Sequence, residues 1–212
     1  MKSWIYCELC GRCISKYKIT NKGKVVCKFG CKPKQGILNK LKKAKEAWLK
    51  ARNSGIGGSD AGIIVGLNKW KSPFQLWLEK TGQVEAESLS DNEFVYWGNV
   101  LEQVVADEFT VRTGKKVMRR GLLQHDELPW LLASVDRMVV GENAGLECKT
   151  ANGFASKMWE DDEIPDSYYC QCQHYMAVTG CEAWYIACLL GGNKFIWKRI
   201  ERNEEDIKAL LM

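Results

Sequence analysis

The stretch SVDRMVVGENAGLECKT, residues 134–150, decides the fold of this chain. Two runs rich in β-branched and apolar residues, LLASVDRMVV and LECKT, flank the turn sequence GENAG, a pattern that is typical of a β-hairpin. Three charged residues, Asp136, Glu147 and Lys149, nevertheless stand inside these runs. Strands that otherwise look buried therefore carry charge, and this charge is the first sign of a functional site.

The pairing of the two strands indicates a carboxylate cluster. Because successive side chains of a strand point to opposite faces, Glu147 and Lys149 share one face of the second strand, while Cys148 and Thr150 share the other. With Asp136 on the partner strand, they would form a compact acidic pocket that contains one cation. Mg²⁺ prefers oxygen ligands of this kind. The simpler interpretation is a cross-strand salt bridge.

A further carboxylate, Glu102, falls on a predicted helix. The sequence NEFVYWGNVLEQVVADEFTVRTG predicts a long helix that ends at Gly114. One turn on either side of Glu102 stand Gly98 and Ala106, which leave room around the carboxylate for another group. The simpler interpretation is an exposed glutamate in a salt bridge. The buried stripe of this helix is predicted to consist of Phe94, Leu101, Val105 and Phe109.

Two helices and a glycine-rich turn are predicted before it. Apolar residues repeat on one face of 37–51 with lysines on the others, and 72–82 begins with the capping box of Ser72 and Gln75. In the turn between them, N–H groups before a short helix favour an anion, and Arg52 and Ser59 would add a charge and a hydroxyl. Such a turn is also common as plain structure.

Composition and charge indicate a basic arm beside an acidic domain. The chain has 212 residues, is 46% hydrophobic and carries a net charge of +5, which suits one α/β core with a small attachment. Residues 1–53 hold 15 Lys or Arg against two Glu, a net charge of +13, which leaves −8 for the other 159 residues. A basic arm favours a polyanion such as nucleic acid. A solvated helix without a partner is the simpler interpretation.

The N-terminal cysteines predict a zinc site. The pairs Cys7-x2-Cys10 and Cys27-x3-Cys31 are separated by 16 residues, a spacing with which four thiolates surround one Zn²⁺. The residues between the pairs resemble a hairpin of the zinc-ribbon kind. Cys13 would be able to replace Cys10, an iron-sulfur cluster would also accept four cysteines, and free thiols are the simplest alternative.

The compartment is predicted to be the cytoplasm. No apolar run approaches the roughly 20 residues of a membrane span, and the first ten residues lack the apolar core of a signal peptide. Ten cysteines in such a chain indicate reduced thiols or metal ligands rather than disulfides.

The ordered set of motifs resembles the PD-(D/E)xK nucleases, and more closely the YqaJ-type phage recombination exonucleases related to lambda exonuclease. The resemblance covers about residues 45–202, including WGNVLEQVVADEF, SVDRMV, LECKT and YYCQCQHYMAVTG. The motif residues occur in the order and approximate spacing of the family: Gly98-x3-Glu102, Asp136, Glu147-x-Lys149 and Gln171-x3-Tyr175.

The resemblance implies a metal site that hydrolyses phosphodiesters. Glu102, Asp136 and Glu147 resemble the metal-binding carboxylates, with the main-chain carbonyl of Cys148 as a further ligand. Lys149 resembles the group that positions or deprotonates the attacking water. The family's cofactor is Mg²⁺ or Mn²⁺, two per active site.

Other positions resemble those that orient the substrate. Gln171 and Tyr175 share one face of the following helix and would orient water or the scissile phosphate. Arg52 and Ser59 match the positions that hold a 5′ phosphate. Asp126 matches a further acidic position of the family.

We therefore expect a zinc-ribbon-like module at 1–36 and an α/β (α+β), restriction-endonuclease-like core at 37–212, with a mixed sheet flanked by helices. The resemblance implies a 5′-to-3′ exonuclease of a phage or prophage recombination system that acts on double-stranded DNA with a free end, with a single-strand annealing recombinase as partner and a ring-shaped trimer as assembly. Alternatives are a restriction-like or repair endonuclease, a Cas4-like nuclease with an iron-sulfur cluster, and a non-catalytic DNA-binding module.

Overall fold

The computed structural model describes residues 17–19, 25–27, 35–89, 91–160 and 163–212. The chain divides into two compact units, residues 1–50 and 51–212. In the first, β1 (Tyr17–Ile19) and β2 (Val25–Cys27) pair antiparallel, with Lys18 opposite Val26. Helix α1 (Gln35–Asn53) follows. Cys7, Cys10 and Cys31 and the side chain of Cys27 lie outside the described residues, so the zinc site and the domain boundary at 36 stay predictions.

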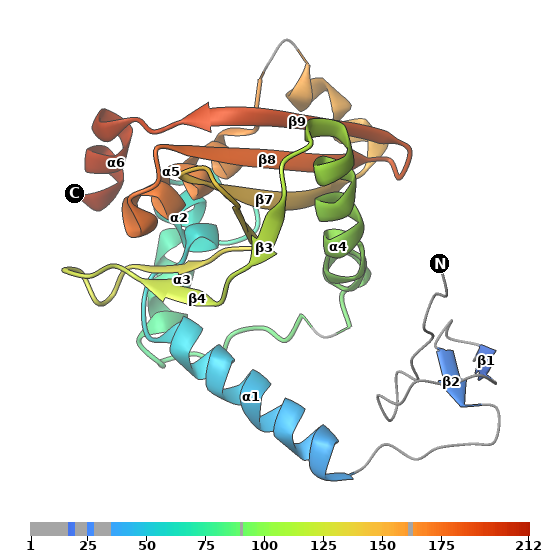
Figure 1. Ribbon diagram of the computed structural model, residues 1–212. Coiled ribbons are helices and arrows are strands. Elements are labelled where there is room, and N and C mark those ends of the chain that lie inside the picture. The colour runs from blue at the N-terminus through green and yellow to red at the C-terminus, as the bar shows by residue number, and fades with distance from the viewer. Residues whose placement is uncertain (1–16, 20–24, 28–34, 90, 161–162) are drawn as a thin grey trace. The chain divides into compact units, whose positions relative to one another are not determined.

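The second unit is built on a mixed five-stranded sheet (Figure 1). Its order is β3-β6-β7-β8-β9, and only β7 and β8 run parallel. The strands are β3 (Val117–Arg119), β6 (Arg137–Val139), β7 (Ala144–Ala151), β8 (Ala183–Leu190) and β9 (Lys194–Glu201). A smaller antiparallel pair joins β4 (Leu122–Gln124) to β5 (Leu132–Ser134). The predicted mixed sheet and the hairpin around GENAG are confirmed.

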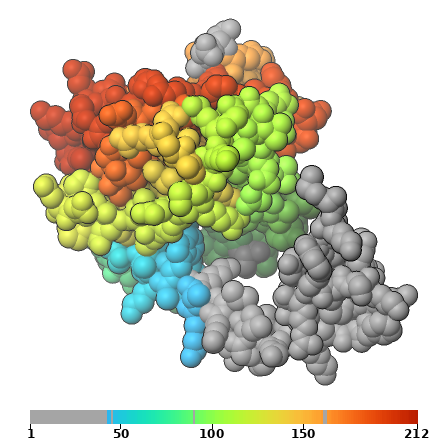
Figure 2. Space-filling view, in the orientation of Figure 1, coloured from blue at the N-terminus to red at the C-terminus, as the bar shows by residue number. Residues whose placement is uncertain are grey.

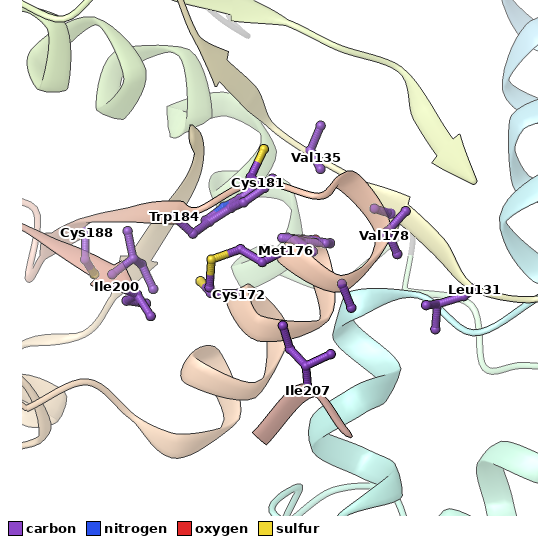
Figure 3. Close-up of a cluster of buried hydrophobic side chains, with 14 of the residues drawn as sticks. Leu131, Val135, Cys172, Met176, Val178, Cys181, Trp184, Cys188, Ile200 and Ile207 are labelled. Atoms are coloured by element: carbon purple, nitrogen blue, oxygen red, sulfur yellow. The ribbon is translucent and has the colours of Figure 1, made fainter. Parts of the chain in front are cut away.

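Helices cover both faces of this sheet. Alternation along β8 sends Trp184, Ile186 and Cys188 to one core and Tyr185 and Ala187 to the other. The first core is closed by α5 (Asp166–Thr179), which lies in the crossover from β7 to β8 after the 3-10 helix η1 (Gly153–Trp159). The second core is closed by α4 (Glu93–Thr113). Figure 3 shows the first core, where Cys172 and Met176 of α5 lie beside Trp184.

The remaining helices extend the α5 side. Helix α2 (Gly58–Ile64) packs on α5, α3 (Pro73–Lys80) follows α2, and α6 (Glu204–Leu211) also packs on α5. Two helix ends follow the predicted signals: Ser72 and Gln75 form the capping box of α3, and Gly114 ends α4 with a φ of 72°. Asn203 caps α6. Within the described ranges, no helix is both long and apolar enough to cross a bilayer.

One predicted core residue is wrong. Phe94 is 81% exposed and Leu101 is half-buried, whereas Val105 and Phe109 of the same helix are buried. The reason is that Phe94 lies in the first turn of α4, before the part of the helix that packs on the sheet. Figure 2 shows the green segment with α4 against the yellow segment that leads into β6 and β7.

Candidate active site

The β6–β7 hairpin brings two carboxylates together. Because Arg137 pairs with Leu146 and Met138 with Gly145, Asp136 comes opposite Glu147. Asp136 is half-buried, and its Oδ2 accepts a hydrogen bond from the backbone N–H of Cys148 at 2.8 Å. Glu147 is buried. The predicted acidic pocket therefore has its two central members side by side.

Lys149 lies on the same face as Glu147, two residues further along β7. Its Nζ is 2.6 Å from Glu147 Oε1 and donates to Gln171 Oε1 at 2.9 Å. The ammonium also lies 4.7 Å from the ring centroid of Tyr168. These contacts hold the ammonium next to the carboxylate of Glu147.

Helix α5 closes the cluster from the other side. The amide of Gln171 donates to Glu147 Oε1 at 2.8 Å and to the hydroxyl of Tyr175 at 2.7 Å. Tyr175 in turn donates to the carbonyl of Ser134 at 3.0 Å. Gln171 and Tyr175, the two α5 residues that the family resemblance indicated, thus form one chain of hydrogen bonds from β7 to β5.

Glu102 of α4 is connected to the backbone of Asp136 by an arginine that sequence analysis missed. Arg137 is buried, and its Nη1 donates to Glu102 Oε1 at 2.5 Å and to the carbonyl of Asp136 at 2.6 Å. A Cβ at Gly98 would lie 3.8 Å from Thr150 of β7, an ordinary van der Waals distance, so α4 passes close to β7 here without requiring a glycine. The only sequence signal for Arg137 was a charged residue directly after Asp136 in an apolar strand.

The electrostatics show an excess of negative charge. Burial, together with the charges of Glu147 and Glu102, raises the pKa of Asp136 to about 8. Burial lowers the pKa of Lys149, but the charge and hydrogen bond of Glu147 outweigh burial, so that this pKa lies above its ordinary value. Burial is also the main cause that raises the pKa of the Cys148 thiol. A neighbouring cation would stabilise the ionised carboxylates.

The donor set fits a hard divalent cation. Glu147 Oε2 is buried and has no hydrogen-bond partner, which is costly for a carboxylate oxygen unless another group binds it. Oxygen donors from Asp136, Glu147 and Glu102 suit Mg²⁺. Across the described ranges, no three His, Cys, Asp or Glu side chains are yet gathered as a metal site.

The predicted phosphate anchor is assembled beside this cluster. Arg52 Nη2 donates to Ser59 Oγ at 3.0 Å. The adjacent Gly58 lies against Tyr175, whose hydroxyl contacts Gln171. The backbone N–H of Gly57 donates a hydrogen bond to Asp60 at 2.9 Å, and Asp60 also pairs with Lys80. The anchor therefore depends on Arg52 and Ser59 rather than on that N–H group.

Two predicted positions contribute less to the geometry. Asp126 is exposed in the bend between β4 and β5, and its contacts are not part of the network that connects the cluster. The backbone of Cys148 is engaged through its N–H with Asp136. Its carbonyl as a metal ligand stays a prediction.

Comparison with known proteins places this geometry in a family. Residues 47–182 match the YqaJ-like viral recombinase domain. The YqaJ protein of Bacillus subtilis (strain 168) is 56% identical over 170 residues, 79% of this chain and 53% of that protein. This chain therefore spans about half the length of that relative.

Solved structures show the same fold. An alkaline exonuclease of Laribacter hongkongensis superposes with a TM-score of 0.65 at 20% identity, covering 78% of this chain and 90% of that one. A phage related exonuclease of Haemophilus somnus 129PT gives 0.59 at 15% identity, covering 74% and 88%. The fold is that of the phage-type exonucleases. The chain belongs to the YqaJ-like viral recombinase domain family.

Proposed function

We propose that this chain is a metal-dependent deoxyribonuclease that digests duplex DNA from 5′ ends in a phage or prophage recombination system. The observation that carries the proposal is the buried, unpartnered Oε2 of Glu147, set among Asp136, Glu102 and Lys149. Membership of a viral recombinase family supports it, as do structural neighbours that are described as exonucleases.

Each side chain has a task in phosphodiester hydrolysis. Asp136, Glu147 and Glu102 would hold Mg²⁺ or Mn²⁺. Bound divalent cations lower the pKa of water and stabilise charge on the attacking and leaving oxygens. Lys149, fixed as an ammonium between Glu147 and Gln171, would position the attacking water.

Gln171 and Tyr175 have a supporting task. The Gln171 amide holds Glu147 and Lys149 at once, so that the carboxylate and the ammonium keep their relative positions. The buried Tyr175 ring fixes the Gln171 amide from the next turn of α5. Catalytic geometry of this kind depends on side chains whose rotamers are locked by their neighbours.

Choice of a DNA end requires a second contact, because a carboxylate cluster hydrolyses any phosphodiester that it reaches. The pair of Arg52 and Ser59 provides a guanidinium and a hydroxyl for a terminal phosphate. The contact of Gly58 with Tyr175 sets this pair next to the α5 residues of the cluster.

The deciding experiment uses linear duplexes labelled at one 3′ end, with and without 5′ phosphate, and a covalently closed circle. With Mg²⁺ we expect nucleotides to be released from 5′ ends, the 3′ label to be lost last, and the circle to stay intact. A chelator should stop the reaction. Cleavage of the circle would favour the restriction-like endonuclease instead. An annealing recombinase as partner and a trimeric ring belong to the same proposal, and size measurement in solution tests the ring.

A further inference from the structure

Arg137 has the burial of a core residue although it carries a charge. Its side chain is 3% exposed, at the start of β6, opposite Arg119 of β3 and Leu146 of β7. Leu146 belongs to the core under α4, so Arg137 points toward α4 as well. Arginine is almost never this buried unless it is paired.

The partners of Arg137 come from the two segments that supply carboxylates. One nitrogen, Nη1, donates to Glu102 Oε1 and to the carbonyl of Asp136, and Nη2 donates to Gln103 Oε1 at 3.0 Å. Glu102 and Gln103 lie on α4, whereas Asp136 lies next to β6. The guanidinium is therefore a direct link between α4 and the hairpin.

Glu102 depends on this link for its orientation. Its side chain is 27% exposed, and the neighbours one turn away on α4, Gly98 and Ala106, have no long side chain to restrain it. A glutamate in this setting loses rotamer freedom only if another group binds it. Arg137 binds Oε1, and the planar guanidinium holds a carboxylate in a defined direction.

We propose that Arg137 is a positioning residue that holds the Glu102 carboxylate next to the backbone of Asp136 and thereby strengthens divalent-cation binding by Glu102, Asp136 and Glu147. This inference rests on the proposed function. A positive charge near a cation site also repels the cation. Orientation prevails because a bound cation keeps Glu102, Asp136 and Glu147 ionised, so that these three carboxylates exceed the charges of Arg137 and Lys149 by one. Arg137 also engages Oε1, one of the two oxygens of Glu102.

The chain offers a matched control in Arg119. This arginine is exposed and donates to the same Gln103 Oε1 at 3.0 Å. It stands opposite Arg137 in the β3–β6 register, and its side-chain bond goes to Gln103 rather than to Glu102. Loss of Arg119 therefore removes a neighbouring charge and a shared acceptor bond without releasing Glu102.

The test is calorimetric titration of Mn²⁺ into the full chain without DNA, with unfolding curves to confirm that each variant is folded. Arg137→Gln should weaken Mn²⁺ binding by about ten- to a hundredfold, the usual effect of losing a residue that orients a ligand. Arg137→Lys should recover part of the affinity, and Arg119→Gln should bind as the wild type does. In a Glu102→Gln background, Arg137→Gln should cause little further loss.

Equal or tighter binding by Arg137→Gln would overturn the inference. The inference would also be overturned if Arg137→Gln weakened Mn²⁺ binding as much in the Glu102→Gln background as in the wild type. The effect of Arg137 on the affinity would then not depend on Glu102. If Arg137→Gln does not fold, Arg137→Lys decides, and wild-type affinity in that variant counts against the inference. Failure of the wild type to bind Mn²⁺ would instead overturn the metal site of the proposed function, and this inference with it.

Discussion

Gly58 lies directly against the ring of Tyr175: a Cβ at position 58 would stand 2.4 Å from Cε1 of that ring and 2.9 Å from Cζ. Tyr175 is 3% exposed, and its hydroxyl joins Gln171 to Ser134. The glycine-rich turn is thus shaped to let α2 approach the helix that carries the candidate active site. This contact connects the predicted phosphate anchor with the predicted catalytic residues.

Gly58→Ala should therefore destabilise the protein. Overpacking of a buried site costs about 1 to 3 kcal/mol, and the buried Tyr175 ring is held in place by the hydrogen bonds of its hydroxyl with Gln171 and Ser134. Denaturant unfolding would measure the loss. Gly121→Ala is the control, since a Cβ there meets nothing within 4 Å, and its effect should stay within about 0.5 kcal/mol. Equal stability of the Gly58→Ala variant and wild type would show that the contact does not constrain the turn.

Arg52→Ala tests end recognition. Loss of a charge-assisted hydrogen bond costs roughly 1.5 to 3 kcal/mol, so digestion of 5′-phosphorylated duplex should slow about tenfold or more, while 5′-hydroxyl ends change little. Initial rates on the two substrates provide the comparison. An equal loss on both kinds of end would mean that Arg52 serves only the local structure with Ser59.

Buried His174 should make stability depend on pH. Burial lowers its pKa, and its Nε2 lies 2.9 Å from the carbonyl of Leu132. The unfolded chain therefore binds a proton more readily than the folded one. This contribution to stability is fully present above the ordinary histidine value of about 6.5 and is lost as the pH falls from there through the folded pKa.

The measurement is the free energy of unfolding across this range for wild type and His174→Gln. The variant should lose less stability on acidification than the wild type. Identical slopes for wild type and His174→Gln would exclude His174 as the titrating group.

The N-terminal cysteines give a separate prediction. If Cys7, Cys10, Cys27 and Cys31 form a tetrahedral site, protein purified without added zinc should contain about one zinc per chain. Elemental analysis, with thiol titration before and after chelation, would measure it. Iron in place of zinc would favour the cluster alternative, and four freely reactive thiols without metal would remove the zinc-ribbon interpretation.

Local patterns predicted those parts of the fold that local physics determines. The hairpin at 134–150 follows from alternation and a glycine-containing turn, the start of α3 follows from Ser72, and the end of α4 follows from Gly114. Phe94 was misplaced because its period matches the buried stripe, whereas burial depends on where the helix meets the sheet. That position is a property of tertiary packing and not of the helix alone.

In the candidate site, too, local patterns predict some contacts and tertiary packing determines the others. Glu147 and Lys149 share a face because they are two residues apart in a strand, and Gln171 and Tyr175 because they are four apart in a helix. The hydrogen bond between Arg137 and Glu102 joins residues 35 positions apart in the sequence. Strand alternation and helix periodicity relate only residues a few positions apart, so neither pattern predicts this bond. Motif order indicated Glu102 as a ligand, but only the structure shows what holds it.

The central claim is that Glu147 and its neighbours hold the metal that hydrolyses DNA, and one comparison tests it most directly. Digestion of 5′-phosphorylated linear duplex with Mg²⁺ should fall by at least about a hundredfold in Glu147→Gln, because the lost interaction contributes several kcal/mol in the transition state. Glu142→Gln changes a carboxylate in the turn of the same hairpin that is paired with Lys115 and Tyr185, and it should keep its rate. Wild-type digestion by folded Glu147→Gln protein would contradict the account.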